Sequence, residues 1–315
     1  MEMLNHRVYT GEQYMGTVIN LQITLFGLIA VGFLIKKIGI IGDAGQKNLN
    51  DLVLNVVLPC NIFKAFVSIG TTDGFSKYLW ILGISLGIQV FCVLYGKLVF
   101  RRFPEGERKC AQYATICSNA GFIGNPVAEG IWGAQGLVLA QFYLIPLRIM
   151  MWSSGLPMFT GERDWKKQVI KVVTHPCIIA CVIGIVFMLL NWKLPSGLMG
   201  IVNAIGSCNT GLSMMVVGMI LSRIDFRQLW DFRVFLFSIH RLIIIPAVVW
   251  LVCRFLPVGP ETLGISVILA AMPAGAKTSI LAVKYDMEPE FATKLVIFST
   301  LMSLPTIALW SMLLG

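Results

Sequence analysis

Charged residues are scarce in this chain. Only 13% of its 315 residues are Asp, Glu, Lys or Arg, whereas soluble domains carry about 25%. Hydrophobic residues make up 57% of the sequence, and apolar runs of about 18 residues or more, long enough to cross a bilayer, recur along its length. The alternating segments of about ten residues that would indicate a β-barrel are missing. The sequence therefore predicts an all-α membrane protein.

Sequence motifs of metal, redox and nucleotide chemistry are also missing. The eight cysteines form no C-x-x-C pair and the three histidines are scattered, so we expect neither a metal site nor disulfide bonds. There is no P-loop, which argues against nucleotide-driven transport by this chain, and the glycines of 121–130 are no nucleotide fingerprint because they belong to no βαβ unit. No H-E-x-x-H motif or Ser-His-Asp arrangement can be placed on facing segments, so we expect no enzyme and no cofactor.

Ten segments are predicted to span the membrane. Their approximate bounds are 17–37, 47–69, 77–99, 107–133, 135–159, 175–192, 196–221, 232–255, 261–285 and 289–313. The links between them are short, and no soluble domain is inserted. The longest link, around 160–168, is expected to carry a short surface helix.

The Lys and Arg residues divide unequally between the two sides of this arrangement. Seventeen lie in or beside one set of links, and five lie on the opposite side: Arg7, Lys64, Lys77, Lys193 and Arg254. The positive-inside rule places the richer side in the cytoplasm and both termini outside it, in a multi-pass protein of the plasma or bacterial inner membrane. This topology accounts for the net charge of +9 without nucleic-acid binding. Residues 1–16 lack a signal-peptide pattern and are expected to form an N-terminal extension.

The order of the segments predicts an inverted repeat. Ten segments divide into two sets of five, and the second set runs opposite to the first because five is odd. Pro126 interrupts the fourth segment, and Pro273 interrupts the ninth, 147 residues later. Asn61 precedes Pro126 by 65 residues and Asn209 precedes Pro273 by 64. We therefore predict repeats over 17–159 and 175–315, joined by a cytoplasmic linker over 160–174.

The two interrupted segments are expected to unwind near the middle of the bilayer. Pro126 lacks an N–H and its ring obstructs the preceding turn, while Gly121 and Gly124 let the backbone leave helical angles. Pro273 and Gly275 would act in the same way in the ninth segment. Unwound backbone at this depth is tolerated only beside protein or a water-filled cavity, so two such links from inverted halves should cross.

A crossing of this kind predicts an anion site. The second half of each broken helix begins at the crossing with free N–H groups, and each N-terminus behaves like roughly half a positive charge. Asn119 and Asn125 can donate to a carboxylate there, and Asn61 and Asn209 are further candidates. The alternative is that the prolines only kink helices so that they pack. Two kinks in corresponding segments, both with polar residues, favour a binding site.

Four charged residues, Glu129, Arg148, Arg241 and Lys277, lie well inside predicted segments, where an unpaired charge is costly. Lys277 follows Pro273 by four residues, and two interpretations stay open: it contacts an anionic substrate or replaces a coupling cation, or it pairs with Glu129. Glu129 is also the candidate proton carrier. Arg241 is interpreted as a structural residue that donates hydrogen bonds to unpaired backbone carbonyl groups near the crossing. For Arg148 both a structural and a substrate-binding role stay open.

Four stretches carry a resemblance to a known family. They are LVLNVVLPCNIFKAF (52–66), SNAGFIGNPVAEGIWGAQG (118–136), RLIIIPAV (241–248) and AAMPAGAKTSILAVKYDMEPEFATKLVIFSTLMSLPTIAL (270–309). With them the chain resembles the auxin efflux carrier family, which includes the plant PIN-FORMED auxin carriers and bacterial carriers of malate or malonate. The resemblance implies a five-plus-five inverted repeat in which helices 1, 2, 6 and 7 form a scaffold and helices 3–5 and 8–10 move as an elevator.

The resemblance also assigns individual residues. Pro126 and Pro273 match the family's crossover prolines, Asn119 its crossover asparagine, and Arg241 its helix-8 arginine. Two features depart from the pattern: the long hydrophilic loop of plant carriers is absent, and Lys277 stands where a small or neutral residue is expected. These departures argue against a plant-type substrate and coupling.

The function predicted from these observations is secondary transport of a small organic anion, malate- or malonate-like, by alternating access. H⁺ or Na⁺ is the expected coupling ion, and a homodimer through the scaffold helices is expected in the lipid bilayer. A sodium–proton antiporter is one alternative, although it would need acidic residues at the crossing. A receptor or scaffold that keeps the fold without transport is the other.

Overall fold

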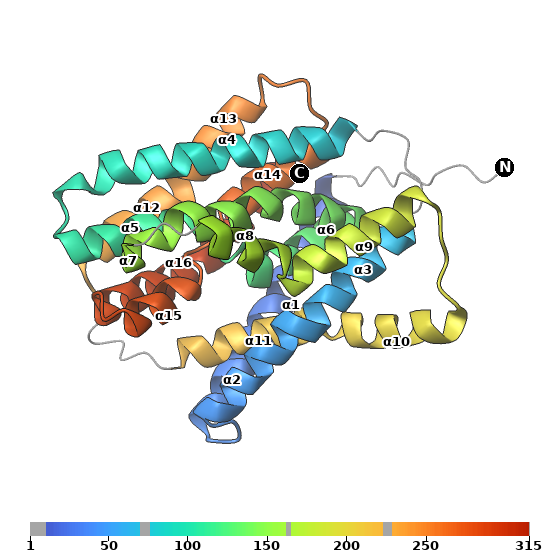
Figure 1. The fold of residues 1–315 in the computed structure, drawn as a ribbon, viewed down its shortest axis with the longest axis horizontal. Helices are drawn as coiled ribbons and strands as arrows, with labels where there is room; N and C mark the ends of the chain where they lie inside the picture. Colours follow the sequence, from blue (N-terminus) through green and yellow to red (C-terminus); the bar gives the residue numbers. More distant parts are fainter. Residues whose placement is uncertain (1–10, 70–75, 162–164, 223–228, 315) are drawn as a thin grey trace.

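The computed structural model describes residues 11–69, 76–161, 165–222 and 229–314, and these residues fold into helices without a β-sheet (Figure 1). In chain order the elements are α1 (Gly11–Lys37), α2 (Asp43–Leu52), η1 (Val53–Val57), α3 (Leu58–Ile69), α4 (Ser76–Val99), η2 (Phe100–Arg102), α5 (Glu105–Ile116), η3 (Ala120–Gly124), α6 (Asn125–Met150), η4 (Met151–Gly155), α7 (Pro157–Thr160), α8 (Trp165–Val173), α9 (Pro176–Leu189), α10 (Ser196–Ser207), α11 (Asn209–Leu221), α12 (Phe232–Ile239), η5 (His240–Ile244), α13 (Ile245–Cys253), α14 (Pro260–Ala270), α15 (Lys277–Lys284) and α16 (Pro289–Leu314).

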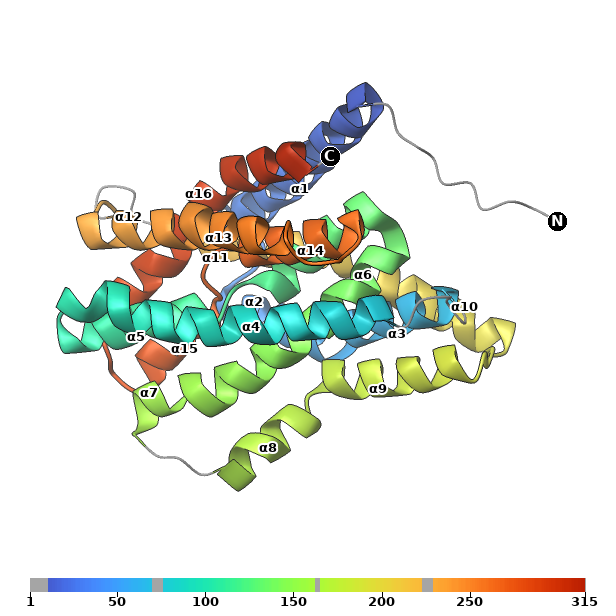
Figure 2. The ribbon, with the colours of Figure 1, turned by 90° about the horizontal axis from the view of Figure 1, so that it is seen from above.

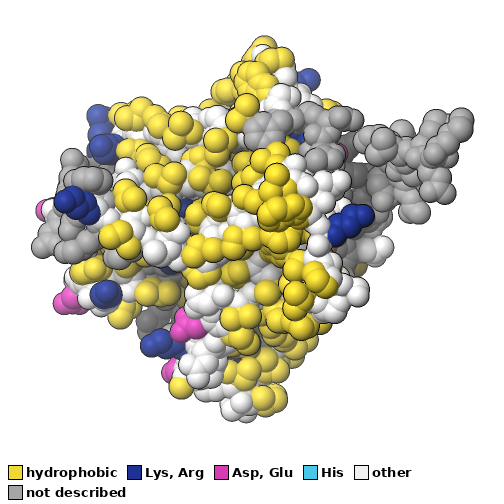
Figure 3. Space-filling model, turned by 45° about the vertical axis from the view of Figure 1, so that its right-hand side comes forward, with side chains coloured by type: hydrophobic (Ala, Val, Ile, Leu, Met, Phe, Trp, Pro, Cys, Tyr) yellow, Lys and Arg dark blue, Asp and Glu magenta, His cyan; other side chains and the backbone are white. Residues whose placement is uncertain are grey.

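Seven helical stretches are long and apolar enough to cross a membrane. They are Val18–Lys37, Asp43–Ile69, Ser76–Arg102, Ala120–Thr160, Ser196–Leu221, Phe232–Cys253 and Pro289–Leu314. Pro176–Leu189 and Pro260–Ala270 are shorter apolar helices. Hydrophobic side chains are spread widely over the face drawn in Figure 3, while Lys and Arg gather toward its margins. The described chain therefore has the composition and surface of a multi-pass helical membrane protein.

The stretch Ala120–Thr160 is too long for a single crossing, since about 20 residues suffice. Its backbone leaves the helical region at Gly133, where φ is 63° and ψ is −153°. Only glycine adopts these angles without strain, because it has no Cβ atom. The change of direction lies between the fourth and fifth predicted segments.

Four π-helical turns occur in the described chain, and each lies just before a proline. The turns η1, η3, η4 and η5 are followed by Pro59, Pro126, Pro157 and Pro246. In an α-helix the proline ring collides with the carbonyl group four residues earlier. In a π turn the N–H group donates to the carbonyl group five residues earlier instead of four. The N–H of Asn125, for example, donates to the carbonyl of Ala120. The helix thus widens at the proline and continues.

Because the chain stays helical through the π turn before Pro126, one prediction from the sequence is wrong. The fourth segment was expected to break at Pro126, but the chain is helical there, and the interruption lies earlier, at residues 117–119. α5 ends at Ile116, and Cys117 has a φ of −94° and a ψ of 83°. The ninth segment is interrupted where the sequence predicted it, since Pro273 lies in the link between α14 and α15.

The helices pack in two sets, which meet where α3 lies against α6 and α1 against α16. α1 lies against α11, and α3 lies against α9 and α10, while α4 contacts α6, α12 contacts α16, and α13 contacts α14. Figure 1 separates α10 and α11 at the bottom from α4 and α13 at the top. The α1–α11 approach is close enough to require glycine: a Cβ atom on Gly218 would lie 2.0 Å from the carbonyl oxygen of Ile29. The expected surface helix of the long link is α8, at the margin of the bundle in Figure 2.

Candidate functional site

The two interrupted segments meet through their backbones. The N–H of Asn119 donates to the carbonyl oxygen of Pro273 at 2.8 Å, and the N–H of Gly275 donates to that of Cys117 at 2.7 Å. These bonds form an antiparallel bridge between Ser118 and Ala274. The two unwound links thus provide hydrogen-bond partners for each other's backbone groups.

Two of the predicted glycines lie where neighbouring atoms leave no room for a side chain at this crossing. A Cβ atom on Gly275 would lie 2.8 Å from the carbonyl oxygen of Cys117, and one on Gly124 would lie 2.6 Å from Cδ2 of Leu269. Both distances are shorter than van der Waals contact allows. Gly275 therefore permits the crossing itself, and Gly124 permits η3 to pack against the end of α14.

A cavity of about 130 Å³ adjoins the crossing. Its lining includes residues at the start of both second half-helices, namely Asn119, Gly121 and Phe122 before and within η3, and Gly275, Ala276 and Lys277 at the start of α15. N–H groups in the first turn of a helix have no acceptor within the helix, and the dipole makes this end positive. The remaining wall is largely apolar, with Leu54, Leu58, Leu144, Leu147, Met151 and Ile280. The cavity is therefore suited to an anion.

Two cationic side chains strengthen the positive potential of this cavity. Arg148 lines it and is only 6% exposed, and Lys277 lines it from the first position of α15. The Nζ atom of Lys277 lies 5.0 Å from the ring centre of Trp152, a cation–π contact. Among the described residues that line the cavity there is no Asp or Glu. A negative ligand would thus meet two cations and two helix N-termini.

One guanidinium nitrogen of Arg148 is hydrogen-bonded, and another has no partner within the described residues. Its Nη2 atom donates to Oε1 of Gln141 at 3.3 Å, and Nε2 of Gln141 donates to Oδ1 of Asn125 at 3.0 Å. The Nη1 atom is buried and has no hydrogen-bond partner within the described residues. A buried guanidinium nitrogen left without an acceptor is costly, so a bound carboxylate would satisfy it.

The other predicted polar residues lie away from the lining of this cavity. Asn61 donates from Nδ2 to Oε2 of Glu129 at 3.0 Å. Glu129 is therefore bonded to an amide of α3, and the described ion pairs do not include one between it and Lys277. Asn209 accepts from Oγ of Ser213 at 3.2 Å. These amides stabilise contacts between and within helices in this structure.

Arg241 lies in the π turn η5 and is 3% exposed. Its neighbour His240 is hydrogen-bonded through Nδ1 to the hydroxyl of Tyr95 on α4 at 2.5 Å. The Nε atom of Arg241 has no partner within the described residues, and the lining of the cavity does not include it. The structure thus places Arg241 outside this cavity, on a turn whose neighbouring residue His240 contacts α4.

Sequence reasoning missed Gln141 and His175. Gln141 is fully buried in α6, and its position seven residues before Arg148 puts both on one face of the helix, which was a readable signal. His175 lines the cavity and caps α9 by accepting the N–H of Cys177 at 3.3 Å. A histidine before a proline at the start of an apolar run was the available signal for that cap.

Comparison with known proteins agrees with this architecture. The family model described as "Membrane transport protein" matches residues 17–311. The chain belongs to this family. The match confirms the resemblance to the auxin efflux carrier family, whose members are membrane transporters rather than enzymes.

Several curated relatives align with nearly the whole transporter. An uncharacterized transporter of Methanothermobacter thermautotrophicus is 28% identical over 299 residues, which cover 91% of this chain and 95% of that protein. An uncharacterized transporter of Methanocaldococcus jannaschii is 26% identical over 302 residues, 91% and 96% of the two chains. A protein of Rhizobium meliloti provisionally named a malonate transporter is 20% identical over 314 residues, 93% and 94% of the two chains.

Proposed function

We propose that this transporter is a secondary carrier of a small organic dianion, a malonate- or malate-like dicarboxylate. The observation that carries the proposal is the cavity beside the crossing, where Arg148 and Lys277 accompany two helix N-termini. A planar guanidinium binds a carboxylate through two parallel hydrogen bonds, and an ammonium can hold a second one. The name of the Rhizobium relative supports the same substrate class.

The proposed mechanism is alternating access by an elevator movement of an inverted repeat over 17–159 and 175–315, joined by the linker 160–174. The seven long helical stretches give ten segments when Ala120–Thr160 is counted as two crossings and the short helices Pro176–Leu189 and Pro260–Ala270 are each counted as part of a further crossing. The packing of α1 with α11, and of α3 with α9 and α10, supports a scaffold of helices 1, 2, 6 and 7. The contacts of α4 with α6, and of α12 with α16, support a separate moving part.

The remaining parts of the proposal concern placement and partners. Both termini lie outside the cytoplasm, as the unequal distribution of Lys and Arg indicates. The scaffold helices form a homodimer, and H⁺ or Na⁺ is the coupling ion. The predicted anion-site residues Gly124, Asn125, Pro126 and Pro273 support the crossing rather than line the cavity, and Asn119, Gly275, Lys277 and Arg148 contact the substrate.

A sodium–proton antiporter fits the geometry less well. Such carriers use acidic residues at the crossing, whereas Glu129 is hydrogen-bonded to Asn61. A receptor of the same fold would use the same cavity to bind an anion but would not move it. Transport measurements separate the three functions.

The test is uptake of radiolabelled malonate and malate into proteoliposomes, with acetate and indole-acetate as competitors. We expect saturable uptake that dicarboxylates inhibit more strongly than either monocarboxylate. Lys277→Gln or Arg148→Gln removes one charge-assisted contact, worth about 1.5–3 kcal/mol, so apparent affinity should fall roughly 10- to 100-fold. Lys284→Gln is the matched control, because Lys284 is exposed at the other end of α15.

Each competing outcome has its own signature. Wild-type uptake in both Lys277→Gln and Arg148→Gln would refute the proposed site. Cation-driven pH change in vesicles without any organic substrate would replace the proposal with an antiporter. Saturable dicarboxylate binding without accumulation would replace it with a receptor.

A further inference from the structure

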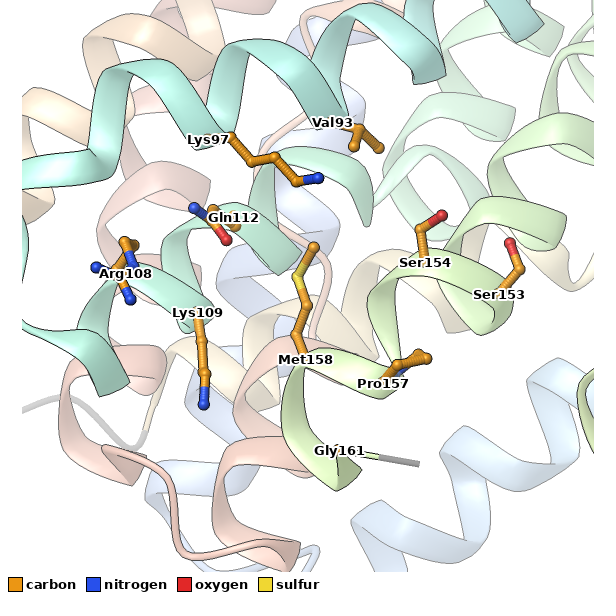
Figure 4. Close-up of a pocket in the computed structure, with 10 residues that line it drawn as sticks. All are labelled: Val93, Lys97, Arg108, Lys109, Gln112, Ser153, Ser154, Pro157, Met158 and Gly161. Carbon is orange, nitrogen blue, oxygen red and sulfur yellow. The ribbon is translucent and has the colours of Figure 1, made fainter. Parts of the chain in front are cut away.

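A second cavity lies between α4, α5 and the turn that joins η4 to α7. Its volume is about 620 Å³, within the range of roughly 300–1,000 Å³ typical of small-molecule sites. Among the described residues it shares no lining residue with the cavity at the crossing. The lining side chains that can donate hydrogen bonds are Lys97, Arg108, Lys109, Gln112, Ser153 and Ser154, drawn in Figure 4.

The charge of this second cavity is positive. Three of its lining residues are cations, and none of those that the structure describes there is acidic. Lys109 is paired with Glu105 at 2.8 Å. Lys97 and Arg108 form no ion pair with any other described residue, and Glu107, next to Arg108, is bound to Arg233. The Glu105 carboxylate also attracts Arg108. Three cations thus stand against one nearby carboxylate, and the remaining positive charge of the cavity favours an anionic ligand.

The wall opposite the cations offers hydroxyl groups. Ser153 and Ser154 lie in the π turn η4, and the Oγ atom of each is 3.9 Å from Sδ of Met150. A thioether sulfur is a weak acceptor, so both hydroxyl hydrogens remain available to a stronger one. In Figure 4 the ammonium of Lys97 extends from α4 into the space between α4 and this turn. Donors thus come from three sides of the cavity.

The number and kind of these donors favour phosphate over carboxylate. A carboxylate presents two oxygens, whereas a phosphate presents three or four, and Arg and Lys are the usual phosphate ligands. Basic pockets between membrane helices on the cytoplasmic side bind phosphate-bearing lipid headgroups. Lys97 lies in the last turn of α4, on the side that is rich in Lys and Arg, which is the cytoplasmic side in the orientation proposed above.

We propose that this cavity is a second anion site, separate from the transport site, that binds the phosphate group of an anionic lipid headgroup or of a soluble organophosphate. Lys97 and Arg108 neutralise the phosphate, while Gln112, Ser153 and Ser154 donate to its remaining oxygens. The ligand joins α4 and α5 to the η4–α7 turn. Occupancy therefore stabilises the contact between the third, fourth and fifth predicted segments.

The test is a thermal-shift titration of the full-length protein, purified in neutral detergent and stripped of lipid. The probes are short-chain phosphatidylglycerol, glycerol phosphate, short-chain phosphatidylcholine and malonate. Binding to the folded state raises Tm by mass action, so each titration yields an apparent Kd. Lys97→Gln/Arg108→Gln is the test variant. Arg101→Gln/Arg102→Gln is the matched control, because these two exposed cations lie nearby in η2 and do not line the cavity.

We expect phosphatidylglycerol or glycerol phosphate to raise Tm more than phosphatidylcholine does. The test variant should bind roughly 30-fold more weakly, since each cation near a membrane surface contributes about 1 kcal/mol. The control variant and Lys97→Arg should bind like the wild type. A response to phosphatidylglycerol alone identifies a lipid, and an equal response to glycerol phosphate identifies a free phosphate ester.

Three results would overturn this site. Equal weakening by the test and control variants would indicate unspecific surface attraction. Unchanged affinity in a well-folded test variant would show that the phosphate does not bind in this cavity. Malonate binding that the test variant abolishes would make the cavity part of the substrate path. None of these results bears on uptake by Lys277→Gln, so the transport proposal stands or fails by itself.

Discussion

Gly275→Ala tests the crossing directly. The added Cβ atom would lie 2.8 Å from the carbonyl oxygen of Cys117 and 3.0 Å from its Sγ atom. Relief requires the two links to separate, which stretches the hydrogen bonds of 2.7 Å and 2.8 Å that join them. Overpacking costs about 1–3 kcal/mol, and each weakened backbone bond about 0.5–1.5 kcal/mol. The expected loss of folding free energy is therefore about 2–6 kcal/mol.

The assay combines thermal unfolding in detergent with uptake in proteoliposomes. For a chain of this size the expected fall in Tm is roughly 5 °C or more, and uptake should be strongly reduced because the cavity loses its shape. Gly87→Ala is the control: the new Cβ atom meets nothing within 4 Å, so Tm should hold or rise slightly. If Gly275→Ala matched the wild type in both Tm and uptake, the close contact of the two links would be refuted.

Two further substitutions test the supports of the site. Glu129→Gln keeps an acceptor for Asn61, which is 1% exposed, so Tm and the pH profile of uptake should stay near wild type. Glu129→Ala leaves that amide without an acceptor and should lower the free energy of unfolding by about 1–3 kcal/mol. Loss of pH-dependent uptake in Glu129→Gln would contradict this structural role and identify Glu129 as a proton carrier. Gly133→Ala forces a side chain onto a φ of 63° and a ψ of −153° and should lower stability by about 1–3 kcal/mol. An unchanged Tm for Gly133→Ala would contradict a fixed turn there.

The helical segments and one of the two interruptions could be predicted from local sequence. Long apolar runs fix where helices lie, and the link around Pro273 unwinds where the proline and Gly275 indicated. The position of the other interruption could not be predicted. Pro126 can be accommodated either by a break or by a π turn, and the sequence around it allows both. The choice depends on Pro273 and Gly275, which supply the hydrogen-bond partners of residues 117–119 from the other half of the chain.

Part of the candidate site could also be predicted from local sequence. A lysine four residues after Pro273 must lie near the start of the second half-helix, so Lys277 could be placed at the cavity from sequence alone. The pairing of Glu129 with Asn61 rather than with Lys277 depends on how α3 packs against α6. Arg148 was left open because its environment is set by the turn at Gly133, which directs α6 back toward the crossing.

The bridge between Ser118 and Ala274 also constrains how the chain is assembled. The N–H of Asn119 finds its acceptor only after the ninth segment has been synthesised, and the N–H of Gly275 finds its acceptor only in the fourth. Until then each unwound link holds polar groups that lipid cannot satisfy. The fourth segment therefore completes its backbone hydrogen bonds only after nearly the whole chain has been synthesised.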